Sequence, residues 1–195
     1  MIRCLDFLFS FLGLLMLSPV FLLIYIIIRV DSHGDAFYFQ TRVGQGGRDF
    51  RLMKFRTMRL NSDQLGGLTI GARDSRITRC GFLLRKYKLD ELPQLINVLK
   101  GDMSLVGPRP EIRKYTELYT EDQKIVLSVK PGITDYASIE YIDENEILGR
   151  STEPEKTYIE VIMPAKIEMN KRYINSISPK EYLKILVITF LKLFR

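Results

Sequence analysis

Residues 85–110, RKYKLDELPQLINVLKGDMSLVGPRP, form the stretch around which the rest of the chain is organised. The apolar residues in its first half are spaced like one face of an α-helix: Leu92, Leu95, Ile96 and Leu99. Asp90 stands where an N-cap is expected, Pro93 falls in the first turn, and Gly101 follows the last turn, where helices end in a left-handed residue. The pattern predicts a helix whose N-terminus carries two adjacent carboxylates.

The segment behind this helix predicts a short strand followed by a stiff turn. The strand covers residues 103–106, and the turn is Gly107-Pro108-Arg109-Pro110, in which two prolines restrict the backbone. Cations flank the acid pair on both sides in the sequence: Arg85, Lys86 and Lys88 precede it and Arg109 follows it.

The acids Asp90 and Glu91 have two interpretations. Carboxylates at a helix start are most often a cap that interacts favourably with the helix dipole. Several cations beside one acid pair also suit a phosphorylated substrate, with a divalent metal ion between the carboxylates and the phosphates. The spacing alone leaves both interpretations open.

The run LDELPQLINVLKGDMSLVGPRP, residues 89–110, resembles the signature of the bacterial sugar transferases, which are monotopic phosphoglycosyl transferases. The resemblance continues in FYFQTRVG (residues 37–44), KFRTM (residues 54–58) and PGIT (residues 131–134), so it covers nearly the whole chain. After PGIT this sequence reads DYASIEY, where the family more commonly continues with Gly-Trp and a later Gly-Arg. The sugar is therefore left unassigned.

The resemblance implies a phosphoglycosyl transferase that moves a sugar 1-phosphate from a UDP-sugar to polyprenyl (undecaprenyl) phosphate. The products are a polyprenyl-diphosphate sugar and UMP. This reaction is the first membrane step in the synthesis of a bacterial glycan such as a capsule, O-antigen, exopolysaccharide or glycoprotein. The enzyme is expected at the cytoplasmic face of the bacterial inner membrane, with membrane lipids as further partners.

The same resemblance implies roles for individual residues. Asp90 is expected to be the nucleophile that forms a covalent aspartyl-phosphosugar, and Glu91 to bind the metal or orient the acid pair. Substrate phosphates are assigned to Lys54, Arg85 and Arg109. Substrate-positioning roles fall to Arg56, Gly107, Pro108 and Pro110. The metal ligands are Asp90 and Glu91. Since the sequence has no Cys/His cluster, the cofactor is predicted to be Mg²⁺ or Mn²⁺, which prefer oxygen ligands.

Charge and composition limit the classes of molecule that the protein is expected to bind. The net charge is +6, and residues 42–100 hold 13 basic and 5 acidic residues, so that segment alone carries +8. A basic centre beside apolar ends favours lipid head groups or phosphorylated substrates over nucleic acid, for which no binding motif is present. Cys4 and Cys80 give neither a disulfide framework nor a zinc spacing, which fits a reducing cytoplasm. His33 is predicted to lie in a turn.

Residues 5–28 are almost continuously apolar and are predicted to form a membrane helix. Ser18 and Pro19 interrupt its middle, and proline kinks a helix. This pattern allows either a kinked spanning helix or a hairpin that enters and leaves by one face. The family resemblance implies the second, a re-entrant helix over residues 1–30 with its break at Ser18-Pro19. Arg3 and Arg29 would then both lie on the cytoplasmic side.

Residues 31–195 are expected to form a single compact catalytic domain of the α/β class, mostly helical with a small β-hairpin or sheet. The hairpin strands are residues 36–40 and 49–55, joined through the glycines of residues 44–47, and residues 60–73 are a predicted loop. The helix that starts near Ile77 is expected to direct Phe82, Leu83 and Tyr87 into the core. Helices are also predicted in residues 111–128 and 154–173. Residues 179–195 suggest an interfacial amphipathic helix, with a buried core helix as the alternative.

A non-catalytic, membrane-anchored module that binds acidic lipids is the alternative function. It accounts for the apolar N-terminus and the basic centre. It gives no reason for two acids in the middle of the positive segment. Release of UMP from a sugar nucleotide distinguishes the enzyme from the binding module.

Overall fold

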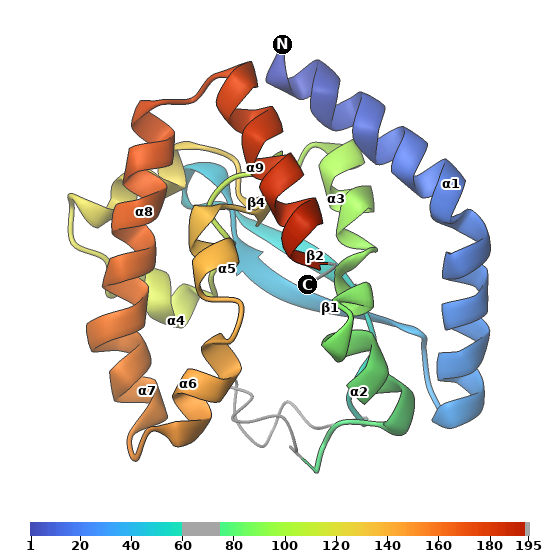
Figure 1. The fold of residues 1–195 in the computed structure, drawn as a ribbon. Helices are drawn as coiled ribbons and strands as arrows, with labels where there is room; N and C mark the ends of the chain where they lie inside the picture. Colours follow the sequence, from blue (N-terminus) through green and yellow to red (C-terminus); the bar gives the residue numbers. More distant parts are fainter. Residues whose placement is uncertain (60–74, 194–195) are drawn as a thin grey trace.

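A computed structural model describes residues 1–59 and 75–193 of the chain. Helices make up most of the described structure, and the strands form two small two-stranded sheets. Figure 1 shows the long N-terminal helix α1 along one side and helix α8 along the other, with the hairpin β1–β2 behind the space between them. The mostly helical fold with a small sheet is confirmed, whereas the loop predicted at residues 60–73 lies outside the described residues.

Helix α1 (Ile2–Asp31) is long and apolar enough to cross a membrane, and it contains Pro19. It changes direction about halfway along its length (Figure 1), where a proline removes one backbone hydrogen bond. Most of its large apolar side chains are exposed, including Phe11, Leu15 and Met16. An apolar surface of this kind is what a membrane anchor presents to lipid.

The N-terminal end of α1 is fixed to the rest of the protein by two charged residues. Asp6 is only 2% exposed, although it stands in an apolar helix. Its carboxylate accepts three hydrogen bonds: from Ser104 Oγ at 2.8 Å, Leu105 N at 2.9 Å and Tyr182 Oη at 2.8 Å. Arg3 donates to the carbonyl oxygens of Val98 and Leu99, which lie near the end of another helix.

The C-terminal end of α1 is fixed to the same domain. Arg56, which is 6% exposed, donates to the carbonyl oxygens of Ser32 and His33 at 2.8 and 2.7 Å. Asp31 accepts a hydrogen bond from the backbone N–H of Cys80 at 3.2 Å. Both ends of α1 are therefore held by one folded unit.

Strands β1 (Phe37–Val43) and β2 (Asp49–Phe55) pair antiparallel and form the predicted hairpin. The register joins Phe37 to Phe55 and Val43 to Asp49, and the short helix η1 (Gln45–Gly47) makes the turn. β1 runs to Val43 and so extends beyond the predicted end at Gln40. Its extra residues, 41–43, pair with residues 49–51 of β2.

Helix α2 (Arg79–Lys86) begins at Thr78, whose side chain accepts a hydrogen bond from Gly81 N at 3.0 Å. The prediction that Phe82, Leu83 and Tyr87 enter the core is wrong, because these side chains are 47%, 55% and 60% exposed. The face of this short helix that packs inward is the opposite one: Cys80, Gly81 and Leu84.

The acid pair lies in a turn rather than at a helix cap. A short 3₁₀ turn, η3 (Leu89–Glu91), precedes α3 (Gln94–Lys100), which starts after Pro93 without a side-chain cap. The N-cap prediction for Asp90 is therefore wrong. Gly101 ends α3 at φ 98°, as predicted from the sequence. The helix is one turn shorter than predicted because the chain forms η3 first.

Strands β3 (Ser104–Val106) and β4 (Gly132–Thr134) form a parallel pair, which places the predicted strand of residues 103–106 in a second sheet. Between them lie α4 (Arg113–Thr116) and η4 (Gln123–Ser128). After β4 come four short elements and two longer helices. The short elements are α5 (Tyr136–Glu140), α6 (Glu144–Arg150), α7 (Pro154–Thr157) and the π-helical η5 (Tyr158–Ile162), and the longer helices are α8 (Met163–Asn175) and α9 (Pro179–Leu193).

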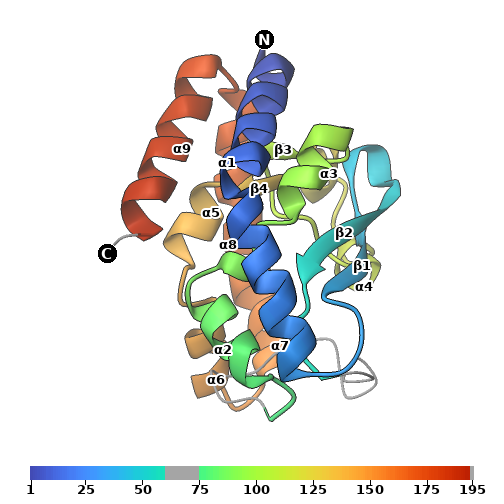
Figure 2. The same ribbon diagram turned by 90° about the vertical axis from the view of Figure 1, so that its right-hand side faces the viewer.

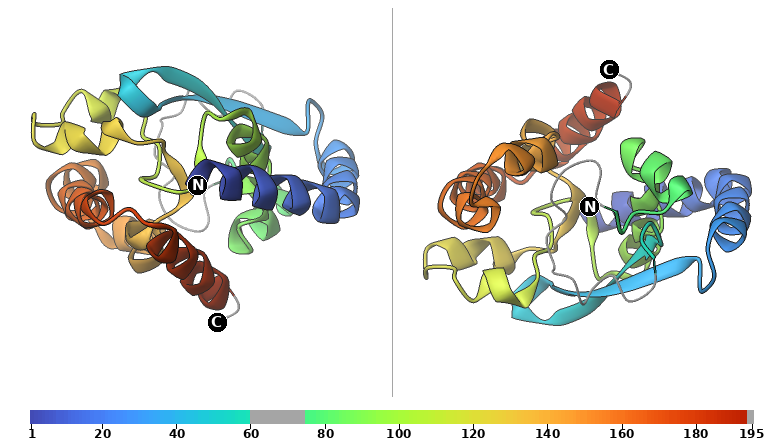
Figure 3. Two further views of the ribbon diagram at one scale, coloured as in Figure 1. Left: turned by 90° about the horizontal axis from the view of Figure 1, so that it is seen from above. Right: turned by 90° about the horizontal axis from the view of Figure 1, so that it is seen from below.

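Helix α9 is amphipathic in the way that the sequence predicts. Tyr182 and Ile185 are fully buried in a core cluster that also contains Val98 of α3, whereas Val187 and Leu191 are exposed. Figure 2 shows α9 at one edge of the molecule and the hairpin at the other, with α1 in the foreground between them. Seen from above in Figure 3, α1 and α9 start close together and diverge.

Candidate active site

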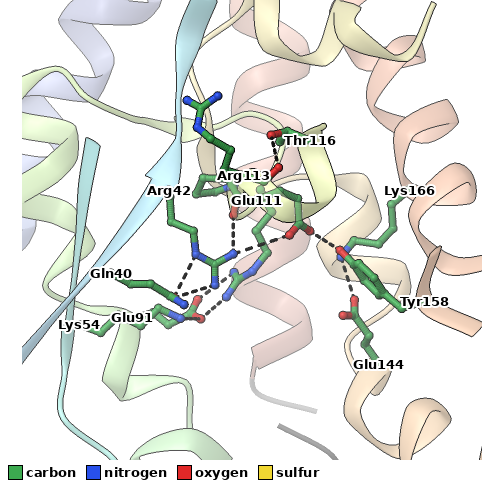
Figure 4. A network of polar contacts seen from close by, with 12 residues as sticks. Gln40, Arg42, Lys54, Glu91, Glu111, Arg113, Thr116, Glu144, Tyr158 and Lys166 are labelled. Carbon is green, nitrogen blue, oxygen red and sulfur yellow. Dashed lines mark hydrogen bonds and ion pairs between the residues drawn. The ribbon is translucent and has the colours of Figure 1, made fainter. Parts of the chain in front are cut away.

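Glu91 is the centre of an ion-pair cluster that joins three separate segments. Lys54 Nζ of β2 lies 3.1 Å from Glu91 Oε1, and Arg109 Nη1 lies 3.0 Å from Glu91 Oε2. Arg109 Nη2 makes a second, shorter hydrogen bond to Oε1, so the arginine grips both carboxylate oxygens. The exposed fractions of the side chains are 18% for Lys54, 16% for Glu91 and 33% for Arg109. Figure 4 shows Lys54 and Glu91 beside Arg42.

Burial and charge shift the pKa values in this cluster. Burial alone would raise the pKa of Glu91, but the charges and hydrogen bonds of Arg109 and Lys54 outweigh it and hold that pKa well below its ordinary value. The charge of Glu91 raises the pKa of Arg109 in return. Burial lowers the pKa of Lys54, although Glu91 opposes this. Glu91 is therefore firmly ionised.

Asp90 differs from its neighbour. It is 7% exposed, and burial, followed by the negative charge of Glu91, raises the pKa of its carboxyl. The charges of Lys54, Arg85 and Arg109 act in the opposite direction. The sequence predicts that these cations lie around Asp90 and keep it ionised, whereas two of them, Lys54 and Arg109, form ion pairs with Glu91.

Arg85, the third cation predicted to bind phosphate, comes from the last turn of α2. Its Nε donates to Thr57 Oγ1 at 2.9 Å, which orients the guanidinium group. Its charge lowers the pKa of Asp90, so it belongs to the same electrostatic environment. The structure therefore brings Lys54, Arg85 and Arg109 to the acid pair from three segments.

The turn that carries Arg109 is locked against β4 by backbone contacts. Gly107 N donates to Thr134 O at 3.0 Å, and Gly132 N donates to Pro108 O at 2.9 Å. A Cβ atom on Gly132 would lie 2.1 Å from Gly107 N, so the two chains can approach this closely only without side chains. This contact gives a physical reason for the GPRP and PGIT motifs.

Asp135 adds a side-chain link to the same turn. It is fully buried, and its Oδ2 accepts a hydrogen bond from the backbone N–H of Arg109 at 3.3 Å. Its Oδ1 accepts from Ser138 N at 2.5 Å and caps α5. One carboxylate thus ties the arginine turn to α5. Asp135 is the first residue of DYASIEY, the segment after PGIT that differs from the common family pattern, and the sequence alone does not indicate its role.

A polar network behind the turn was also missed from the sequence. Arg42 donates to Gln40 Oε1 and to the carbonyl oxygen of Pro110 at 3.0 Å, and it lies 3.7 Å from Glu111 Oε2. Tyr158 donates a short hydrogen bond to Glu111 (Figure 4). The network supports the end of the GPRP turn. Arg42 lies in the quoted motif FYFQTRVG, but nothing in the sequence identifies its partners.

Among the residues predicted to position substrate, Gly107, Pro108 and Pro110 belong to the turn that holds Arg109. Arg56 has a different place, because its guanidinium group is bound to Ser32 and His33 at the end of α1. These contacts give Arg56 a structural task, and its role toward substrate stays a prediction.

A cleft of about 310 Å³ opens beside Glu91 and Arg109. One wall is formed by η3, α3 and the arginine turn, and the other by β4, α5, α6, α8 and α9. Its polar residues include Tyr141, Glu144 and Lys166, and Lys166 Nζ lies 2.8 Å from Glu144 Oε2. The cleft is of the size that small-ligand sites have.

Magnesium was predicted from the sequence, with Asp90 and Glu91 as ligands. This ion is usually held by one or two carboxylates together with substrate phosphates and water. The acid pair fits that donor set, and the described residues contain no group of three or more His, Cys, Asp and Glu placed to hold a metal. A metal here would therefore be held jointly with a substrate.

Comparison with known proteins decides the family. A family model described as bacterial sugar transferase matches residues 1–195. The chain belongs to the bacterial sugar transferase family. The match includes the acid pair, the three cations and the GPRP turn, which lie in or beside the motifs that resemble the family.

Three curated relatives of this family member carry informative names. UDP-N-acetylgalactosamine-undecaprenyl-phosphate N-acetylgalactosaminephosphotransferase of Aeromonas hydrophila is 41% identical over 70% of this chain and 33% of its own length. A putative undecaprenyl-phosphate N-acetylgalactosaminyl 1-phosphate transferase of Bacillus subtilis is 42% identical over 62% of this chain and 67% of its own length. UDP-glucose:undecaprenyl-phosphate glucose-1-phosphate transferase of Escherichia coli is 35% identical over 98% of this chain and 40% of its own length.

The chain matches between 33% and 67% of the length of these three relatives. The sugars in these names differ, since one name contains N-acetylgalactosamine, one contains N-acetylgalactosaminyl and one contains glucose. All three names contain undecaprenyl phosphate. None of the three names supports the alternative of a non-catalytic lipid-binding module.

Proposed function

We propose that the chain transfers a sugar 1-phosphate from a UDP-sugar to polyprenyl phosphate, giving a polyprenyl-diphosphate sugar and UMP. The observation that carries this proposal is the acid pair itself. Asp90 is buried and forms no ion pair with a cation of residues 1–59 or 75–193, whereas its neighbour Glu91 is held by Lys54 and Arg109 at the edge of a cleft. The names of the relatives support the same reaction class.

The proposed first step is attack by an Asp90 carboxylate oxygen on the phosphorus that bears the sugar. A bond forms between Asp90 and this phosphorus, and the bond from the phosphorus to the oxygen of UMP breaks. In the second step a phosphate oxygen of the lipid attacks the same phosphorus and releases the Asp90 carboxylate. Two transfers thus replace one difficult reaction between two anions.

The cations have the task of balancing negative charge in both steps. Lys54 and Arg109 neutralise Glu91 in the structure, and substrate phosphates compete with that carboxylate for them. Arg85 lies close enough to influence the charge of Asp90 and to meet the phosphate that is attacked. Charge stabilisation of this kind is the main contribution of a protein to phosphoryl transfer.

Magnesium, held by Asp90 and Glu91 together with the donor diphosphate, would neutralise the phosphate charge. Excess chelator is expected to abolish UMP release, and magnesium or manganese to restore it without zinc. Binding of manganese to the protein, followed by its magnetic resonance signal, should weaken in Glu91→Gln. Full turnover in chelator would contradict the metal assignment.

Release of UMP from a panel of UDP-sugars tests the function and identifies the donor. With donor alone, about one equivalent of UMP should appear before any lipid is added. The protein should gain the mass of one sugar phosphate at Asp90, and hydroxylamine should remove it. A strict need for both substrates before any UMP appears would contradict the covalent intermediate and indicate direct transfer.

For the membrane, we propose that α1 enters and leaves by the cytoplasmic face. Arg3 and Asp6 bind one end of α1 to the domain, and Arg56 binds the other end through Ser32 and His33. A straight spanning helix would instead place its two ends on opposite sides of a hydrocarbon core about 30 Å thick. The bend near Pro19 allows both ends to stay on one side.

Accessibility of the two chain ends tests this topology. Cysteine tags at both ends, in a Cys4→Ser background, should stay unlabelled when intact cells are treated with an impermeant reagent. Pro19→Leu removes the break and should increase labelling of the N-terminal tag. Labelling of that tag alone in the unmodified helix would contradict the re-entrant arrangement.

A further inference from the structure

We propose that the cleft contains a separate site for the isoprenyl phosphate acceptor, in which Lys88 and Lys192 bind the lipid phosphate and the apolar walls bind the first isoprene units. This inference rests on the proposed function and adds to it the place of the second substrate. The donor phosphates would remain with Lys54, Arg85 and Arg109 beside the acid pair. The two substrates would then meet at Asp90 from different sides.

The walls of the cleft are more apolar than a sugar nucleotide requires. Five aliphatic side chains line the cleft, from the end of η3, α3, β4, α5 and the segment after α5: Leu92, Leu95, Ile133, Ile139 and Ile142. The hydroxyl groups of a sugar and the polar edges of a nucleotide need hydrogen-bond partners, whereas an isoprenoid gains by leaving water for such walls. The apolar part of the cleft therefore fits the lipid better than the donor.

The cations that line the cleft fall into two pairs. Arg109 is bound to Glu91, and Lys166 is bound to Glu144 at 2.8 Å. Within residues 1–59 and 75–193, neither Lys88 nor Lys192 forms an ion pair with an acid. Two positive charges beside apolar walls thus have no partner carboxylate in the described parts of the chain. A phosphate attached to an isoprenoid complements this combination in charge and in polarity.

Lys88 has a left-handed backbone conformation, which determines where the residue lies relative to the acid pair. At φ 56° it is the one non-glycine residue with a positive φ in the described parts of the chain. This conformation costs free energy for a side chain with a Cβ atom, and it turns the chain from α2 into η3, which carries Asp90 and Glu91. Lys88 is therefore placed two residues before the proposed nucleophile by the same turn that exposes its side chain.

The surface around the cleft offers a path from a membrane. Lys88 follows α2, whose Phe82, Leu83 and Tyr87 are exposed, and Lys192 lies in α9, where Val187 and Leu191 are exposed. Both lysines line the same cleft, and each lies within a few residues of these exposed apolar side chains in the sequence. An isoprenoid could pass from lipid into the cleft along these side chains without crossing water.

The test compares two double variants with the same loss of charge. Lys88→Gln/Lys192→Gln removes the two cleft lysines. Lys86→Gln/Lys180→Gln removes two exposed lysines outside the cleft lining, one in α2 two residues before Lys88 and one in α9, the helix of Lys192. Steady-state kinetics with farnesyl phosphate as the acceptor give KM for acceptor and donor separately. Calorimetry measures the binding of farnesyl phosphate directly.

The cleft variant should raise the KM and the dissociation constant for farnesyl phosphate about tenfold, because each lost charged contact weakens binding. Its KM for the UDP-sugar should stay within about twofold of the wild-type value, and the control variant should resemble the wild type. In the apolar wall, Ile139→Asn should weaken the binding of farnesyl phosphate more than that of the shorter geranyl phosphate.

Three results would overturn the acceptor site: equal effects in both double variants, an effect on the donor KM alone, or unchanged binding of farnesyl phosphate. Equal effects in both double variants would mean that Lys88 and Lys192 act only through the overall surface charge. Failure of the proposed function is a distinct result, in which the wild type releases UMP from no UDP-sugar. The calorimetric comparison still decides the acceptor site in that case.

Discussion

Two nearly buried carboxylates, Asp6 and Glu91, are held in opposite ways. Asp6 accepts hydrogen bonds from neutral groups only, two hydroxyls and one backbone N–H. Glu91 is held by two cations, Lys54 and Arg109, and lines the cleft. Asp6 lies at the junction of α1, β3 and α9 and does not line the cleft beside Glu91.

This difference separates a structural acid from one suited to chemistry. The donors around Asp6 belong to the backbone and to packed side chains, so breaking these bonds leaves buried groups unpaired. The cations around Glu91 can exchange one anion for another, because a substrate phosphate satisfies them as well as the carboxylate does. The type of donor, rather than burial alone, distinguishes the two acids.

The largest expected effect is that of Asp90→Asn. The amide keeps the size of the side chain but removes the nucleophilic oxygen anion, so turnover should fall by about a thousandfold or more. The covalent adduct should be absent in mass spectrometry. The melting temperature should stay close to that of the wild type, since a buried carboxylate is replaced by a neutral group. Normal turnover of this variant would exclude Asp90 as the nucleophile.

Glu91→Gln should have the next largest effect. The substitution leaves Lys54 and Arg109 without their anion and weakens metal binding, so turnover should fall about 10- to 100-fold while the adduct at Asp90 still forms. Single-turnover measurements of UMP release give both quantities. Glu144→Gln, which breaks the ion pair with Lys166 in the same cleft, is the matched control and should reduce turnover less.

Asp6→Leu should lower stability rather than catalysis. It leaves three donors without an acceptor, so the free energy of unfolding should fall by about 2 kcal/mol or more. Denaturant unfolding in detergent measures the change, and turnover per folded molecule should stay near the wild-type value. A stable but inactive Asp6→Leu protein would assign this acid to catalysis and remove the contrast with Glu91.

Tyr182→Phe should have the smallest effect. It removes one of the three donors to Asp6 and keeps the ring packed between α9 and the core, so the expected loss is about 1 kcal/mol. The same unfolding measurement applies. If the free energy of unfolding fell as much as in Asp6→Leu, the hydrogen bond from Tyr182 alone would account for the stability of the junction of α1, β3 and α9.

The parts of the fold that local sequence patterns control could be predicted. The hairpin, the glycine that ends α3 and the amphipathic helix α9 (Pro179–Leu193) all follow from alternation, turn residues or helical spacing. Asp90 was placed at a helix cap because it precedes an apolar helical pattern. The chain forms a separate turn there, which local spacing does not reveal.

Helical spacing also failed to tell the packed face of α2 from its exposed face. Phe82, Leu83 and Tyr87 have the composition of core residues, but the packed face of α2 is the one with Cys80 and Leu84. Apolar side chains occur on protein surfaces as well as in cores, so the pattern does not distinguish the two faces. In the candidate site, the motifs indicated the acids and the cations, whereas the pairing of Glu91 with Lys54 and Arg109 depends on contacts between distant segments.

The bonds of Asp6 have a consequence for the order of events during synthesis. One of its partners, Tyr182, lies 176 residues later in the chain. At about 5–20 residues per second, a ribosome needs roughly 10 to 35 s to produce that tyrosine after Asp6. During this interval α1 lacks the contact that joins its first turns to α9. The apolar surface of α1 is therefore present on the growing chain before the domain that holds both of its ends is complete.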